Sequence, residues 1–310
     1  MITSSIKQDS SNSNTEYILA LEDDVSLSPL YFQYATHCIT RVLHPSNQET
    51  HADIQACSLY TPRTNELIAT SDPEHPLPLN VQQIFTARLK QKDSEVSWRK
   101  HYFLSLIPCS WGTILSSKTW SQFLVYYNLR LSTEIQPLPH LRSSIWTNSW
   151  KRYLIEYAGI YPLVTLYPLY KSEQSFSTNW FETGAHSWGS DVETGTSGED
   201  ELKRLYPDEL KDPELIDERF TVPLLDRAKF EQNGGWEAFD KDIADLAHQL
   251  KGAKRRMELL VLDFVGNVKA LGEVLEDSKI YQATVCKAID CSGFLGEYVE
   301  YDPNTIEAVE

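Results

Sequence analysis

Short apolar runs alternate with stretches of helical spacing along much of the chain. The short runs predict four strands, at residues 17–21, 54–59, 102–107 and 164–167. Apolar residues three and four positions apart predict three helices, at residues 28–43, 118–131 and 146–157. Strands that alternate with helices are typical of an α/β fold, which is the fold class that we expect here.

Three carboxylates, Glu22, Asp23 and Asp24, stand where the first predicted strand should end. Ser28 and Pro29 then fit the N-cap and the first position of the following helix. Ligands of α/β proteins bind beyond the carboxyl ends of strands. Adjacent carboxylates repel one another, and Mg²⁺ or Mn²⁺ with its preference for oxygen ligands would relieve that repulsion. The cluster is a candidate metal site, and a solvated acidic turn is the alternative.

A different pattern begins beyond residue 235. Apolar residues alternate spacings of four and three from Phe239 to Phe264, and Leu271 and Leu275 continue this heptad seam after one slip. The pattern predicts a helical tail over residues 236–310. Either the tail forms a coiled coil that makes a homodimer through residues 239–275, or its apolar face folds back on the preceding domain.

Composition adds three constraints. The net charge of −16 argues against a nucleic-acid partner, because neutralising phosphates requires clustered Lys and Arg. The five cysteines, an odd number, imply no disulfide framework and no convincing zinc site. We find neither a signal peptide nor a run of 18 apolar residues. Residues 1–15 are polar and are expected to be disordered, and the acidic residues 191–235 are interpreted as a linker.

Five segments in order resemble the family-2-like glycosyltransferases of the GT-A superfold. They are EYILALEDDVSLSPLYF, IQACSLYTPR, CSWGTILSSKTWSQFLVYY, WKRYLIEYAGIYPLVTLYPLY and SFSTNWFETGAH. The nearest likeness is to a poorly characterised branch found in plants, fungi and bacteria, and it covers residues 16–190. The resemblance implies a partial GT-A domain, with a Rossmann-like mixed sheet and flanking helices.

The resemblance also implies an activity, the transfer of a sugar from a nucleotide-sugar donor to a glycan, lipid or protein acceptor. Mn²⁺ or Mg²⁺ would assist by stabilising the charge that builds on the leaving diphosphate. Asp24 would bind this metal, with His186 as a candidate second ligand. Glu22 and Asp23 would contact the ribose, the sugar or a metal-bound water. An exposed loop histidine is the alternative for His186.

Further roles follow from the same resemblance. Trp111 and Gly112 fall in the segment that lines the sugar and acceptor side, where glycine lets the backbone approach a ligand. A buried core residue is the alternative for Trp111. Lys151 and Arg152 would neutralise phosphate, unless they belong to a solvated helix face. The base that activates the acceptor is not identified, and Glu173 and Glu182 are its candidates.

One departure from the superfold lies at the front of the sequence. In the GT-A superfold, the nucleotide base binds a βαβ half that precedes the acidic motif. In this sequence, only the polar residues 1–15 precede the first predicted strand. The resemblance therefore implies a fragment or an incomplete donor site. The localisation is unknown: the sequence as given is expected to be soluble, and a full-length form would associate with Golgi or secretory membranes if it carries an N-terminal anchor.

Two other functions are compatible with the sequence. A degenerate transferase domain joined to an oligomerising helix would act as a non-catalytic scaffold. A metal-dependent hydrolase could use the same acids, but we find no H-x-D or H-E-x-x-H pattern to accompany them.

Overall fold

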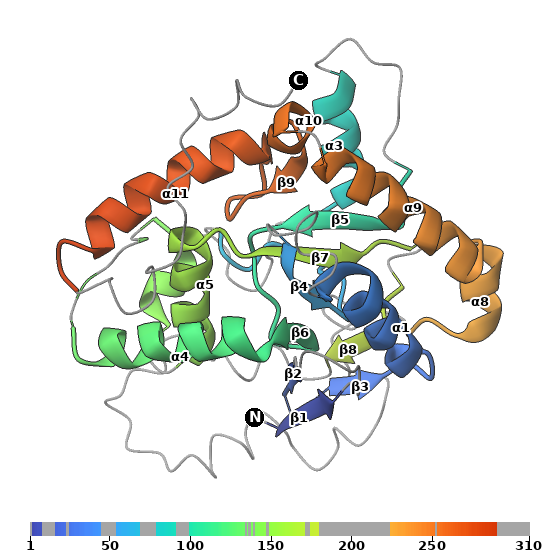
Figure 1. The fold of residues 1–310 in the computed structure, drawn as a ribbon, viewed down its shortest axis with the longest axis horizontal. Helices are drawn as coiled ribbons and strands as arrows, with labels where there is room; N and C mark the ends of the chain where they lie inside the picture. The colour runs from blue at the N-terminus through green and yellow to red at the C-terminus, as the bar shows by residue number, and fades with distance from the viewer. Residues whose placement is uncertain are drawn as a thin grey trace, which may run out of the picture.

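The structure is a computed structural model, shown in Figure 1. It describes residues 2–7, 16–22, 25–44, 54–68, 79–90, 99–133, 135, 138, 140–146, 149–170, 174–179, 224–251 and 253–289. Helices cover a central sheet, and segments from both ends of the described chain contribute strands to it.

The described residues form an eight-stranded sheet with the strand order β1-β2-β6-β4-β7-β5-β9-β10. Its strands are β1 (Ile2–Lys7), β2 (Glu16–Leu21), β4 (Ile54–Ser58), β5 (Tyr102–Ser105), β6 (Thr113–Ser116), β7 (Val164–Pro168), β9 (Leu260–Leu262) and β10 (Val268–Ala270). The pairs β4–β7 and β5–β9 are parallel and the other pairs are antiparallel. A second sheet pairs β3 (Val25–Leu27) with β8 (Ser177–Asn179). The α/β fold and the mixed sheet are thereby confirmed.

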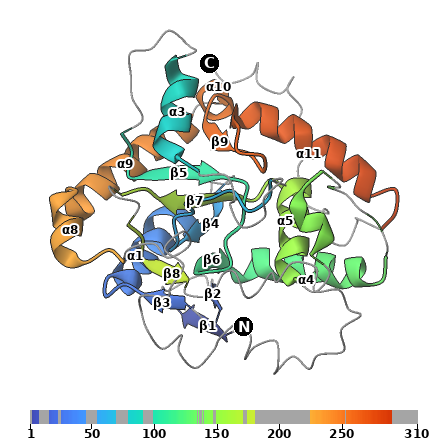
Figure 2. The same ribbon diagram turned by 180° about the vertical axis from the view of Figure 1, so that it is seen from behind.

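Helices flank this sheet, as the sequence predicts. They are α1 (Tyr31–Cys38), α3 (Val81–Lys90), α4 (Ser117–Leu131), α5 (Trp150–Ile160), α8 (Arg227–Gln232), α9 (Gly235–Leu250), α10 (Ala253–Met257) and α11 (Leu271–Val285), with the short π-helix η1 (Ile39–Leu43) and the 3-10 helix η2 (Arg142–Ile145). In the view from behind, α5 stands beside α4, and α11 runs past the end of α5, in agreement with the contacts between these helices (Figure 2).

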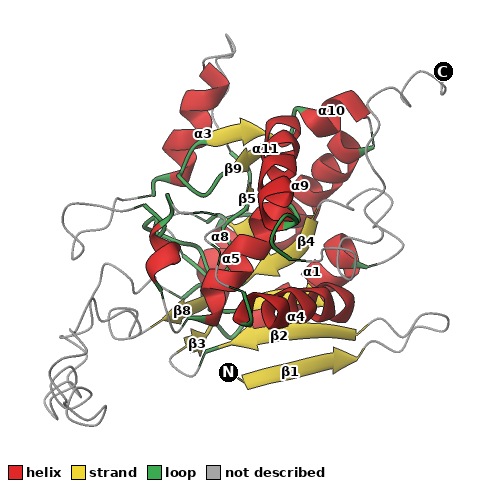
Figure 3. Cartoon of the chain, turned by 90° about the vertical axis from the view of Figure 1, so that its left-hand side faces the viewer, coloured by secondary structure: helices red, strands yellow, loops and turns green. Residues whose placement is uncertain are grey.

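The central strands bury side chains on both faces of the sheet. In β5, Tyr102 and Leu104 belong to the larger apolar cluster, whereas Phe103 belongs to a smaller one. In β9, Val261 joins the larger cluster and Leu262 the smaller. This alternation follows from the two-residue period of a strand. Residues of α1, α5, α9 and α11 fill the larger cluster, while α3 supplies the smaller one from the opposite side of the sheet (Figure 3).

Two expectations for the N-terminal region are corrected. Within residues 1–15, which were expected to be disordered, Ile2–Lys7 pairs along its full length with β2 as an edge strand. A polar edge strand needs no apolar run, so the composition of this segment concealed it. Residues 1 and 8–15 lie outside the described residues. The first helix begins at Tyr31 rather than near Ser28, because residues 25–27 form β3. Ser28 still accepts a hydrogen bond from the N–H of Leu30.

The next two helices differ in how well they match their predictions. The helix predicted at 118–131 is confirmed as α4, whose N-cap Ser116 accepts a hydrogen bond from the N–H of Thr119. The helix predicted at 146–157 begins only at Trp150, with η2 and Trp146 preceding it. Trp146 is buried among the residues of the larger cluster, and this tertiary contact explains its apolar character.

The C-terminal region is not one continuous helix. The predicted heptad seam is broken between α10 and α11 by β9 and β10, which continue the main sheet beyond β5. Its residues Phe239, Leu246, Phe264 and Leu271 are buried in the larger cluster of the same chain. The region therefore folds back on the domain, and these contacts give no support to a coiled coil or to a homodimer through residues 239–275.

The predicted linker over residues 191–235 is also corrected where the structure describes it. Leu224 forms a parallel bridge with Ser175, and Leu225 is fully buried. Asp226 then caps α8 by accepting a hydrogen bond from the N–H of Lys229. Residues 224–235 thus belong to the folded domain, and the rest of this segment lies outside the described residues.

Two observations complete the description. None of the described helices combines the length and the apolar composition that crossing a membrane requires. Cys286, just after α11, is disulfide-bonded, which the odd cysteine count did not suggest. Cys38, Cys57 and Cys109 are free and buried.

Helix α9 is fixed to the start of β5 by Asp242. One carboxylate oxygen, Oδ2, accepts a hydrogen bond from the backbone N–H of His101 at 2.7 Å and lies 2.8 Å from Nδ1 of its ring. Oδ1 lies 3.3 Å from Nζ of Lys100. Burial alone would raise the pKa of Asp242, but the hydrogen bonds from His101 and the charge of Lys100 lower it below its ordinary value.

We expect Asp242→Asn to lower the free energy of unfolding by about 1–3 kcal/mol at pH 7, because charge-assisted hydrogen bonds are lost. A carboxylate with a lowered folded-state pKa contributes stability above about pH 4, and this contribution disappears as the pH falls through the folded-state pKa. The difference between the two proteins should therefore shrink between pH 5 and pH 3 in urea titrations. Asp245→Asn, one turn later and more exposed, is the control and should show a smaller loss.

Candidate functional site

The candidate site lies at the edge of the sheet where several strand ends meet. Ala20 near the end of β2 and Ser58 at the end of β4 both pair with Thr113, the first residue of β6. β7 runs parallel to β4, so it ends at the same edge. Residues that follow β2 and β4 are therefore neighbours of residues that precede β6. This register, rather than closeness in sequence, places Glu22 beside Trp111.

Trp111 contacts residues from three other segments of the chain. Its indole Nε1 donates a hydrogen bond to Oε2 of Glu22 at 3.1 Å. Nζ of Lys151 lies 4.6 Å from the centroid of its ring, within the range of a cation–π interaction. The ring of Tyr60 meets it edge to face, with the centroids 4.8 Å apart. Three of the residues that the sequence singled out, Glu22, Trp111 and Lys151, are thus in contact with one another through Trp111.

Lys151 enters this site from the first turn of α5. Its Nζ lies 2.6 Å from Oε1 of Glu66, and only 4% of the residue is exposed. A solvated helix face is therefore the wrong interpretation for Lys151. Burial alone would lower the pKa of Lys151, but the Glu66 carboxylate raises it above its ordinary value, so the side chain is charged at neutral pH.

Glu66 is a residue of this site that the sequence reasoning missed. It stands alone among polar residues after β4, and no local pattern sets it apart. Its importance comes from a contact with Lys151, which is far away in sequence. The only available signal was its position just beyond the end of a predicted strand, where α/β proteins bind ligands.

A narrow pocket lies beside this ion pair. Its lining includes Glu66, Lys151, Trp111, Tyr60, Cys109 and Tyr167. Tyr167 donates a hydrogen bond to the carbonyl oxygen of residue 107 at 2.7 Å, which fixes that wall. Burial raises the pKa of the Cys109 thiol, so it is protonated and is not an activated nucleophile. The pocket therefore combines aromatic walls with one buried ion pair.

Gly112 has a packing role at this edge. Its φ of +113° is strained for other residues, and a Cβ added there would lie 2.9 Å from Cβ of Leu59. The carbonyl oxygen of Gly112 accepts a hydrogen bond from the N–H of Leu59 at 2.7 Å. The close approach that glycine permits at this position is to Leu59, and the contact with a ligand that the resemblance implies stays a prediction.

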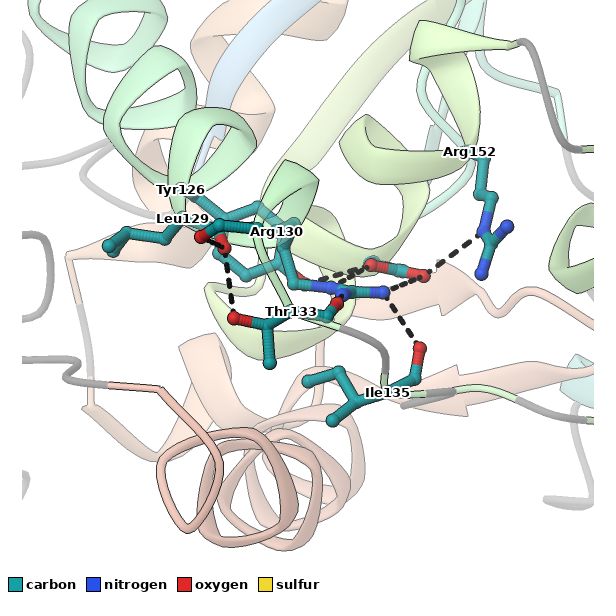
Figure 4. A network of polar contacts seen from close by, with 8 residues as sticks. Tyr126, Leu129, Arg130, Thr133, Ile135 and Arg152 are labelled. Atoms are coloured by element: carbon teal, nitrogen blue, oxygen red, sulfur yellow. Dashed lines mark hydrogen bonds and ion pairs between the residues drawn. The ribbon is translucent and has the colours of Figure 1, made fainter.

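Arg152 does not share the contacts of its neighbour Lys151. Its Nε lies 3.4 Å from Oε1 of Glu156, one turn later in α5. Glu156 also receives a hydrogen bond from Nε of Arg130 at 2.8 Å and another from the hydroxyl of Tyr126 at 3.0 Å. Figure 4 shows Arg152 at the margin of this network around Arg130. The network joins α4 to α5, so the contacts of Arg152 are those of a residue that supports packing.

The other predicted site residues, Asp23, Asp24, Glu173, Glu182 and His186, lie outside the described residues. Within the described part of the chain, no group of three or more His, Cys, Asp or Glu side chains could hold a metal ion. Glu22, which is described, uses Oε2 to bind Trp111. The described residues therefore do not form a metal site by themselves.

Comparisons of this chain with protein-family profiles, with curated proteins and with solved structures found no match.

We expect Gly112→Ala to destabilise the fold by about 2 kcal/mol or more, because it combines a strained φ with a clash against Leu59. Gly272→Ala is the matched control. Gly272 lies inside α11 and a Cβ there would approach its nearest atom only to 3.4 Å, so this variant should unfold at or above the wild-type urea concentration. Equal stability of the two variants would contradict the packing of Gly112 against Leu59.

We also expect Glu156→Gln to lower the free energy of unfolding by about 3 kcal/mol, because it leaves the buried Arg130 without its counter-charge. Glu276→Gln, which alters an exposed ion pair with Lys279, should change it by less than about 1 kcal/mol. Chemical denaturation of both variants measures the difference. A loss at Glu156 as small as that at Glu276 would mean that water compensates Arg130.

Proposed function

We propose that this chain is a glycosyltransferase that moves a sugar from a nucleotide-sugar donor to an acceptor hydroxyl, at the edge of the sheet where β2, β4 and β7 end. The observation that carries the proposal is the contact of Trp111 with both Glu22 and Lys151. These residues come from three of the segments on which the glycosyltransferase resemblance rests.

The proposal assigns different tasks to these side chains. Glu22 is fixed by the indole of Trp111, so its carboxylate has a defined position. Asp23 and Asp24 follow it directly in the sequence. Lys151 contributes a fixed positive charge beneath the same indole. A charge that is already in place costs no reorganisation when negative charge develops on a leaving diphosphate. The site would thus be prepared for charge separation before the donor binds.

The proposal includes a divalent cation, Mn²⁺ or Mg²⁺, with Asp24 and His186 as its ligands. When bound, such a cation stabilises negative charge on phosphate oxygens. Oxygen-rich carboxylate ligands suit both ions. The base that takes the proton of the acceptor hydroxyl is proposed to be a carboxylate, and Glu173 and Glu182 stay its candidates.

The test is ligand-induced thermal stabilisation with UDP-sugars and GDP-sugars, with and without Mn²⁺. A donor at 100 times its Kd should stabilise the protein by about 2.7 kcal/mol, which raises the Tm of a chain of this size by roughly 5 °C. The shift should require Mn²⁺ and should disappear in Asp24→Ala. Asp245→Ala, on the exposed side of α9, is the matched control and should retain it.

Two results would contradict the proposal. If no nucleotide sugar shifts the Tm and Asp24→Ala behaves like the wild type, the non-catalytic scaffold becomes the better description. If the protein instead hydrolyses phosphoesters without any sugar donor, the acidic residues serve a hydrolase.

A further inference from the structure

The two carboxylate oxygens of Glu66 differ in their partners: one forms an ion pair and the other has no hydrogen-bond partner among the described residues. Oε1 forms the 2.6 Å ion pair with Lys151. Oε2 is buried and has no hydrogen-bond partner among the residues that the structure describes. A buried carboxylate oxygen without a partner costs free energy, so a native protein keeps one only where something else satisfies it. We therefore expect a hydrogen-bond donor next to Oε2.

The charges around Glu66 restrict the chemical nature of this hydrogen-bond donor. Lys151 already compensates the negative charge of Glu66, so the pocket does not require a second cation. An anion placed at Oε2 itself would be repelled, because this oxygen carries part of the negative charge of the carboxylate. The described residues also offer no cluster of metal ligands here. A neutral O–H or N–H group is the donor that fits this arrangement.

The walls and the size of the pocket narrow the choice further. Tyr60, Trp111 and Tyr167 provide aromatic surface around the ion pair, and the space between them holds about one water-sized group. A space of this size admits one hydroxyl group rather than a whole sugar ring. Sugars carry hydroxyl groups that donate hydrogen bonds to carboxylates, so one hydroxyl of a sugar fits here.

We propose that Oε2 of Glu66 accepts a hydrogen bond from a hydroxyl group of a bound sugar, with Lys151 as the residue that positions the carboxylate. This assignment rests on the proposed function for its ligand class. It gives Glu66 the role of selecting the sugar, because a site built to bond one hydroxyl rejects a ligand that lacks it. The hydroxyl belongs either to the donor sugar or to the acceptor sugar, and the two sources are separable.

The test compares the wild type with Glu66→Gln, in which an amide N–H₂ replaces the acceptor Oε2. The probes are UDP, GDP, four UDP-sugars (glucose, galactose, N-acetylglucosamine and N-acetylgalactosamine), GDP-mannose, and the same five free sugars. Calorimetry in the presence of Mn²⁺ measures the affinity for the nucleotides and nucleotide sugars. Saturation-transfer NMR in the presence of UDP or GDP and Mn²⁺ measures the binding of the free sugars. Glu276→Gln is the control for the same chemical change at an exposed ion pair.

If the hydroxyl belongs to the donor, Glu66→Gln should weaken a nucleotide sugar about tenfold while UDP and GDP bind as before. If it belongs to the acceptor, only the free-sugar signal should fall. The inference is overturned if every probe binds Glu66→Gln as it binds the wild type, since Oε2 would then contact only an ordered water. An equal loss for UDP, GDP and the nucleotide sugars overturns it as well.

Two further results keep the outcome clear. Glu66→Gln leaves Lys151 without its counter-charge. The double variant Glu66→Gln/Lys151→Met, which removes both charges, is therefore measured with the same probes. Unfolding curves establish that both variants are folded. If the wild type binds no nucleotide at all, the proposed function fails. The free sugars without nucleotide then decide the inference alone, which stands if they bind in a Glu66-dependent way and falls if they do not.

Discussion

The pairing of β6 with two neighbours at once is the constraint on which the site depends. Thr113 lies opposite Ala20 of β2 on one side and opposite Ser58 of β4 on the other. Because both pairings are antiparallel, the start of β6 is held against the ends of the other two strands. Trp111 and Glu22, 89 positions apart in sequence, become hydrogen-bonded neighbours for this reason. A shift of one residue in the β2–β6 register would turn the side chains of Trp111 and Glu22 to opposite faces.

Helix α5 converts this edge into a charged site. It carries Lys151 toward Trp111 and Glu66, and Glu156 toward Arg130 in α4. Burying charges costs several kcal/mol per ion before the pairing energy is recovered. A helix with two opposite buried charges can therefore occupy only the position in which both find their partners. The pair of Lys151 with Glu66 lies in the pocket, and the pair of Glu156 with Arg130 joins α5 to α4.

The sequence predicted the elements whose signals are local. β2, β4, β5, β7 and α4 followed from apolar runs and helical spacing, and the contact among Glu22, Trp111 and Lys151 is compatible with the roles that the resemblance implied for them. β6 was missed because Thr113–Ser116 is short and runs directly into a helix. Glu66 was missed because its partner, Lys151, is distant in sequence.

The C-terminal region shows how a local signal misleads. Its apolar residues follow a heptad through Leu260, Phe264 and Leu271, yet Gly266 with its φ of +81° turns the chain between β9 and β10. The spacings of three and four reflected burial against the domain rather than one continuous helix. Periodicity reports which residues are covered, but it does not identify the surface that covers them. The polar strand β1 is the opposite case, in which a regular element carries no apolar signal.

The order of strands in the sheet has a consequence for how the protein is synthesised. The exposed edge of β5 receives its neighbour only when β9 arrives, and Leu262 accepts a hydrogen bond from the N–H of Leu106 across 156 positions of sequence. While the ribosome is still making the C-terminal region, the backbone of β5 offers unpaired groups to any other nascent strand. This side of the sheet is therefore completed only after β9 and β10 have been made, long after β5 itself.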